Sequence, residues 1–81
     1  MYFINNNPTD IQAVLKIITQ KRLHRAIKNK GYPLPTDANK FILIVKNQKG
    51  YLYYKYGIKP TLILDLLPME LPKGNWVLFK D

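Results

Sequence analysis

The feature that most constrains this fold is a pair of apolar segments around a tight turn, within residues 40–56. Lys40 to Asn47 (KFILIVKN) is rich in β-branched residues, and Tyr51 to Tyr56 (YLYYKY) is rich in aromatic residues, as strands are. Between them, Asn47-Gln48-Lys49-Gly50 predicts the tight turn of a β-hairpin. Because side chains alternate between faces along a strand, this hairpin has apolar residues on both faces. We expect helices to cover one face, and either the C-terminal segment with Trp76 or a second subunit, in a homodimer, to cover the other.

Weaker signals place the remaining strands. Tyr2 to Ile4 and Trp76 to Lys80 (WVLFK) predict a first and a last strand, whereas Thr61 to Leu67 fits either a short helix or a strand. With 81 residues and no linker or internal repeat, the chain is expected to form a single domain over residues 1–81. The fold class expected is α+β, with a helical region packed on a small antiparallel sheet.

The helical region, residues 8–30, begins at a cap (Asn7 or Thr9) and contains an apolar stripe that changes direction. The apolar residues form two sets: Ile11, Val14, Leu15 and Ile18, then Leu23, Ala26 and Ile27. On a helical wheel the second set is rotated from the first by roughly 90° or more. One long amphipathic helix would direct the two sets at different neighbours. Two helices joined by a tight turn, with Thr19 capping the second, would direct both at one core. Both arrangements remain open at this point.

Charge is the strongest signal for function. The chain has 13 Lys+Arg and 5 Asp+Glu, a net charge of +8, and basic domains of this size commonly bind phosphate polyanions or acidic partners. Six of the cations lie in residues 16–30, where there is no acidic residue. This clustering favours a binding surface over the evenly spread charge of a protein from a Lys-rich genome.

Sites for chemistry are scarce in the sequence. There is no cysteine, which excludes a disulfide framework, a thiolate metal site and a cysteine nucleophile. We find no phosphate-binding glycine loop, no Ser/His/Asp grouping and no metal-ligand cluster, so we expect neither an enzyme nor a bound metal or cofactor. No apolar run is long enough to span a membrane and no secretory signal is present. We therefore expect a cytoplasmic protein, in the host cell cytoplasm if the protein is viral.

The stretch from Thr9 to Lys28, TDIQAVLKIITQKRLHRAIK, resembles the helix-turn-helix of phage repressor, Cro-like and excisionase-type DNA-binding proteins. The matches are a small residue in the first helix, an apolar residue closing the turn, and apolar positions in the second helix, namely Ala13, Ile18, Leu23 and Ala26-Ile27. The resemblance implies that residues 19–29 form the recognition helix. It also implies a left-handed residue in the turn, at Ile17 or at Lys16.

The resemblance further implies which residues bind DNA. The candidates are Thr19, Gln20, Lys21, Arg22, His24, Arg25, Lys28, Lys30 and Lys49. Gln20, Lys21 and Arg22 would face the bases, whereas Lys28 and Lys30 would face phosphates. Lys49 lies at the tip of the hairpin, which is similar to the wing of winged-helix proteins. The function expected is sequence-preferring binding of double-stranded DNA, as a small transcriptional regulator or accessory factor of the phage or mobile-element type.

Two other functions remain open. In one, the basic helix docks on an acidic protein partner, and the protein is an interaction or inhibitor protein. In the other, the hairpin binds single-stranded nucleic acid or RNA by stacking bases on Tyr51, Tyr53 and Phe41.

Overall fold

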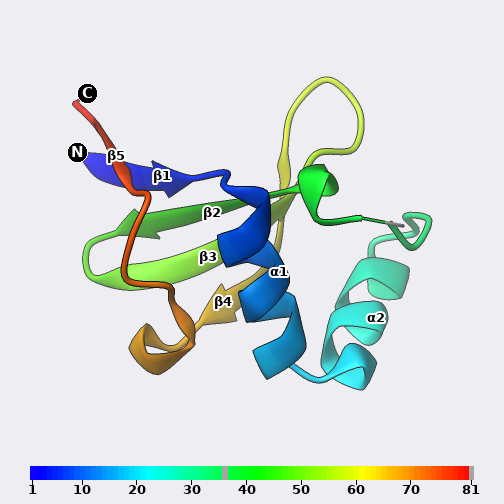
Figure 1. Cartoon of the computed structure of the whole chain (residues 1–81). Coiled ribbons are helices and arrows are strands. Elements are labelled where there is room, and N and C mark those ends of the chain that lie inside the picture. The colour runs from blue at the N-terminus through cyan, green and yellow to red at the C-terminus, as the bar shows by residue number, and fades with distance from the viewer. Residues whose placement is uncertain (36, 81) are drawn as a thin grey trace.

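A computed structural model, which describes residues 1–35 and 37–80, shows two helices packed on one face of a five-stranded antiparallel sheet (Figure 1). The expected α+β class, with a helical pair on a small antiparallel sheet, is confirmed. The elements in chain order are β1 (Tyr2–Asn5), α1 (Pro8–Ile17), α2 (Gln20–Asn29), η1 (Ala38–Lys40), β2 (Phe41–Lys46), β3 (Lys49–Tyr54), β4 (Thr61–Leu66), η2 (Pro68–Glu70) and β5 (Val77–Phe79). The strands lie side by side in the order β4-β3-β2-β1-β5. Among the described residues, no helix has the length and apolar character needed to cross a bilayer.

Helix α1 begins at a side-chain cap that is tied to the sheet. The Asn7 side chain accepts a hydrogen bond from the Asp10 backbone N–H at 3.0 Å, so Asn7 rather than Thr9 is the cap. Asn5, fully buried at the end of β1, donates from its amide to the Asp10 carboxylate at 2.9 Å and to the Gly74 carbonyl at 3.0 Å. This amide, more than any other group, holds the pKa of Asp10 below its usual value.

The helical region forms two helices, so the alternative of one long helix is wrong. Helix α1 ends at Ile17, and Ile18 and Thr19 are extended, with φ of −75° and −68°. The Thr19 hydroxyl accepts a hydrogen bond from the Arg22 N–H at 3.2 Å and caps α2, as predicted. The left-handed residue implied at Ile17 or Lys16 is also wrong, because both residues lie inside α1 and neither has a positive φ. Two extended residues change the chain direction without placing a β-branched side chain in a left-handed conformation.

Both helices contribute to the same core, as expected for two helices joined by a tight turn. Ile11 and Val14 of α1 and Leu23 and Ile27 of α2 are buried. The sheet contributes buried side chains that point toward the helices, chiefly Phe41, Leu43, Leu52, Tyr54 and Leu66. Since helices of ten residues are marginal on their own, this shared burial is what stabilises them.

The predicted hairpin is formed by β2 and β3. In its turn, Asn47 and Gln48 have φ of 53° and 65°, which is the left-handed pair of a type I′ turn. The segment that fitted either a helix or a strand is strand β4, paired antiparallel with β3. The predicted first and last strands are present as β1 and β5.

The second face of the sheet has no covering element among residues 1–35 and 37–80, which corrects one expectation. The C-terminal segment does not lie over the hairpin, because β5 pairs with the edge of β1 and extends the sheet. Trp76 packs on the helix side, where it shares a small apolar pocket with Phe3 and Val45. Its indole N–H donates to the Pro72 carbonyl at 2.9 Å.

Candidate nucleic-acid interface

The carboxylates of the structure neutralise little of its positive charge. Asp10 is bonded by amide side chains, Asp37 caps η1, and Glu70 pairs with Arg22 at 2.9 Å. Asp65 is exposed at the sheet. Among the described residues, no lysine forms an ion pair. The lysine charges are therefore available to an external partner.

Helix α2 presents a row of cations on the side away from the core. Leu23 and Ile27 are buried, and the opposite side of the helix carries Lys21, Arg25 and Lys28, all exposed. These three residues, termed the outward stripe, follow one another at intervals of four and three residues, so they are neighbours on the helix surface. No acidic residue lies anywhere on α2.

Arg22 contacts the fold instead of joining the outward stripe. Its guanidinium donates to Glu70 Oε2 at 2.9 Å and to the backbone carbonyl of Asp65 at 2.8 Å. Glu70 is only 8% exposed, and its other carboxylate oxygen accepts a hydrogen bond from the Leu67 N–H at 2.8 Å. Arg22 thus joins α2 to β4 and η2. The base contact expected for it would require this link to break.

Three other predicted DNA-binding residues, Thr19, Gln20 and His24, are not part of the outward stripe. Gln20 and His24 line a pocket of about 430 Å³ between α1, α2 and η1. The Thr19 hydroxyl is occupied as the cap of α2. Of the three residues expected to face bases, Gln20, Lys21 and Arg22, only Lys21 belongs to the outward stripe.

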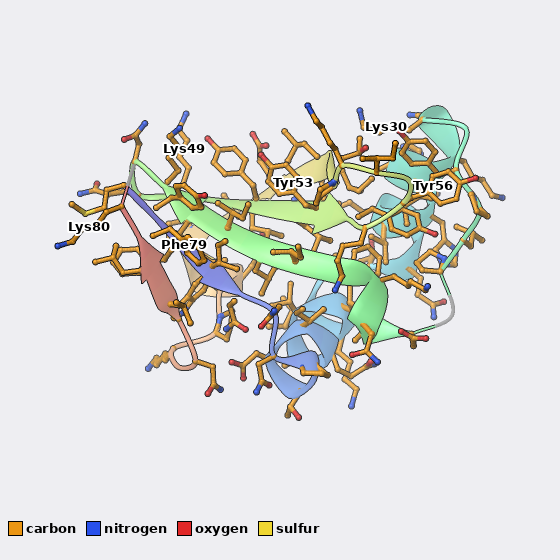
Figure 2. The ribbon with its side chains drawn as sticks, turned by 90° about the horizontal axis from the view of Figure 1, so that it is seen from above. Lys30, Lys49, Tyr53, Tyr56, Phe79 and Lys80 are labelled. Atoms are coloured by element: carbon orange, nitrogen blue, oxygen red, sulfur yellow. The ribbon has the colours of Figure 1, made fainter. Side chains whose placement is uncertain are left out.

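The predicted wing does not adjoin α2. Figure 2 shows Lys30, which follows α2, and Lys49, which begins β3 beside the hairpin turn, toward opposite ends of the molecule. The loop that lies next to the end of α2 is instead residues 55–60. The centroids of the Tyr56 ring, in this loop, and of the Tyr32 ring are 4.9 Å apart.

Sequence reasoning missed this β3–β4 loop as a candidate surface. Its Ile58 side chain is fully exposed, and Lys55 and Lys59 lie on either side of it in the sequence. Gly57 and Pro60 are the sequence signal for a loop at this place. Ile58, an apolar residue between two lysines, is the signal that could have identified this loop as a candidate surface.

The uncovered side of the sheet is mainly apolar and aromatic. This surface, termed the open face, comprises Tyr2, Ile4, Ile42, Ile44, Lys46, Lys49, Tyr51, Tyr53, Leu62, Asp65, Val77 and Phe79. Each of these side chains is half-buried or exposed, whereas most of the alternate residues of β2 and β3, on the helix side, are buried. Phe41 is one of those buried residues, at 1% exposure, so it does not share a face with Tyr51 and Tyr53.

Tyr2 and Phe79 are aromatic residues of the open face that sequence reasoning missed. Their rings stack with centroids 5.7 Å apart and an interplanar angle of 8°. They come from opposite ends of the chain and meet because β1 pairs with β5. Each lies in a segment predicted to be a strand, but no local signal indicated that these two strands are neighbours.

The structure therefore offers two candidate surfaces, the outward stripe and the open face. Within residues 1–35 and 37–80, no group of three or more His, Cys, Asp or Glu side chains is placed to hold a metal ion. Comparisons of this chain with protein-family models, with curated proteins and with solved structures give no match.

Proposed function

We propose that this protein binds double-stranded DNA through the outward stripe, with α2 lying in the major groove. The observation that carries the proposal is the exposure of Lys21, Arg25 and Lys28 on one side of a helix that has no carboxylate. An α-helix is about 10–12 Å across with its side chains, which matches the major groove, about 12 Å wide. Leu23 and Ile27 hold the opposite side of α2 in the core, so the cations project from a fixed support.

The three cations have different roles in this proposal. Arg25 lies in the middle of the stripe, and its planar guanidinium can bond to O6 and N7 of guanine. Lys21 and Lys28, about one turn to either side, supply charge to the phosphates on the two walls of the groove. Lys30 follows the helix and adds a further phosphate contact. Base contact is thus assigned to Arg25 rather than to Arg22, because Arg22 is bonded to Glu70.

Binding of this kind needs no reaction, and we assign no catalytic step to the protein. A regulator or accessory factor acts by occupying its site and by contacting other proteins there. This is the role that the resemblance to helix-turn-helix proteins implies.

The proposal is tested by titrating a labelled duplex with the protein at several salt concentrations. If Lys21, Lys28 and Lys30 neutralise phosphates, log K should fall against log salt with a slope of about −3. The double variant Lys21→Gln/Lys28→Gln should reduce that slope by about 2. The matched control is Lys46→Gln/Lys49→Gln, which removes the same charge from the open face and should leave the slope nearly unchanged.

Two results would overturn the proposal. If the folded protein does not bind the duplex at about 50 mM salt, the acidic protein surface considered from the sequence becomes the partner of α2. If both double variants lose affinity equally, binding depends on the total charge of the chain and not on the outward stripe.

A further inference from the structure

We propose that the open face is a second binding site, which holds single-stranded DNA by stacking its bases on the aromatic rings of the sheet. This site lies on the side of the sheet opposite the helices and uses no residue of the outward stripe. It therefore goes beyond the duplex binding proposed for α2, and the two can be tested independently.

The aromatic residues form two groups on this face. Tyr51 and Tyr53 lie on β3, on the same side of the strand and about 7 Å apart along it. Tyr2 and Phe79 form the stacked pair on β1 and β5. Because β2 and β1 lie between β3 and β5, Phe79 is about 14 Å from the line of β3. Figure 2 shows Phe79 toward one end of the face and Tyr53 over its middle.

Aliphatic side chains join these two groups into one surface. Ile44 lies between Ile4 and Tyr51 in a single cross-strand row, and Ile42 is the partner of Tyr53. All of these side chains are half-buried, so they form a low platform without a deep cavity. Every base has a flat π-face that can stack on such a platform, whatever its identity. Bases inside a duplex are already stacked on one another, so the platform favours single strands.

Positive charge on the open face favours a polyanion as its occupant. Lys46 and Lys49 are direct partners across the β2–β3 hairpin and both project from this face. Like charges that are directly opposite in a sheet repel each other, and a bound phosphate would remove this repulsion. Asp65 is the one carboxylate among the paired residues of this face. Lys80 lies beside Phe79, at the same end as Lys49 (Figure 2).

The same charge argues against a second copy of this chain as the occupant. A face-to-face homodimer would bring together two chains that each carry a net charge of +8, with a lysine pair on each contact surface. A DNA strand supplies one negative charge per nucleotide and covers the same apolar surface.

The occupant proposed for the open face is DNA rather than RNA. Its paired residues include no Ser, Thr, Asn or Gln side chain. Contacts to the 2′-hydroxyl group are what allow a protein to select RNA over DNA. Apart from its lysines and Asp65, the platform has only tyrosine hydroxyls as polar groups, so it has no dedicated site for a 2′-hydroxyl group. The proposed role of α2 also concerns DNA.

The test is the binding of a labelled oligothymidylate of about 12 nucleotides, followed by fluorescence anisotropy. Tyr53→Ala should weaken binding about 5- to 150-fold, which corresponds to the loss of one stacked base. Tyr53→Phe keeps the ring and should bind like the parent protein. Lys46→Gln/Lys49→Gln should weaken binding and reduce its salt dependence, whereas Lys21→Gln/Lys28→Gln should not. Trp76, on the helix side of the sheet, reports by its emission whether each variant is folded.

Several outcomes would overturn this inference. They are the absence of oligothymidylate binding by the folded protein, equal binding by Tyr53→Ala and the parent, and binding more than about tenfold tighter to the ribose form of the same oligonucleotide. A dimer in sedimentation equilibrium that Tyr53→Ala dissociates would assign the face to a second copy instead. If the parent protein binds oligothymidylate but not the duplex, the proposed function of α2 is wrong and this site stands.

Discussion

Arg22 and Arg25 lie three residues apart on α2, yet their guanidinium groups have different surroundings. Three residues correspond to a net rotation of about 60° around the helix axis. This rotation is enough to bring Arg22 over β4 and η2, where it bonds to Glu70 and to the Asp65 carbonyl. Arg25 remains exposed on the outward stripe. At the scale of single residues, position around the helix therefore separates a structural arginine from one available for binding.

Alanine substitution should separate these two roles. Arg22→Ala leaves the largely buried Glu70 carboxylate without its cation and should lower the free energy of unfolding by about 1–3 kcal/mol. Arg25→Ala should change the free energy of unfolding by less than about 0.5 kcal/mol. It should instead weaken duplex binding by about tenfold or more. Urea denaturation and duplex titration of both variants measure this, and the reverse pattern would contradict the assignment.

At the scale of elements, backbone conformation in two tight connections determines where glycine is tolerated. The junction between α1 and α2 uses extended Ile18 and Thr19, with Lys16 still helical. The turn between β2 and β3 uses Asn47 and Gln48, both left-handed. Glycine is unfavourable inside a helix but has no steric penalty at positive φ. The same substitution should therefore have opposite effects in the two places.

Glycine and alanine variants at these positions test both connections. Lys16→Gly should be less stable than Lys16→Ala by about 1 kcal/mol, and Lys28→Gly against Lys28→Ala, inside α2, is the control with a similar loss. Gln48→Gly should be more stable than Gln48→Ala by about 1 kcal/mol. Denaturant midpoints provide the comparison. Equal stability of the Gly and Ala variants at position 16, with the expected loss at position 28, would mean that the chain turns at Lys16.

At the scale of the whole molecule, Tyr54 links the sheet to the connection that follows α2. Its ring is 3% exposed and packs against Phe41, with centroids 5.4 Å apart. Its hydroxyl donates to the Pro33 carbonyl at 2.8 Å. Burial raises the pKa of Tyr54 above its usual value of 10.0, and the neighbouring Tyr56 adds to the effect. The folded protein therefore holds this proton more tightly than the unfolded chain does.

This difference predicts a loss of stability in alkali. Because the pKa is raised in the folded state, the contribution of Tyr54 is fully present below about pH 10 and is lost as the pH rises through the folded pKa. Tyr54→Phe removes the titrating group, so its free energy of unfolding should fall less steeply above pH 10. At neutral pH the variant should be less stable by about 1 kcal/mol, because the bond to Pro33 is lost. Parallel pH profiles for the two proteins would contradict the prediction.

The sequence by itself determined the local features of this fold. The caps Asn7 and Thr19 and the Asn47-Gln48 turn were predictable, since each depends on hydrogen bonds or backbone preferences within three or four residues. The change in direction of the apolar stripe required either two helices or two separate neighbours, and the helical pair is what forms. The cations of the outward stripe were also among the predicted DNA-binding residues, because their spacing on a helix is a property of the sequence alone.

Only the tertiary structure decided which of these residues are free and which surfaces are exposed. Arg22 is bonded to Glu70, 48 residues away, and the stacked pair of Tyr2 and Phe79 depends on strands from the two ends of the chain. The hairpin sequence indicated two apolar faces but not that β5 would extend the sheet and leave one of them open. Local sequence patterns reflect interactions within a single helix, strand or turn. The order of the strands and the choice of which sheet face is covered instead depend on the closure of long loops. They also depend on which apolar surfaces are buried, because a chain of this size cannot bury all of them.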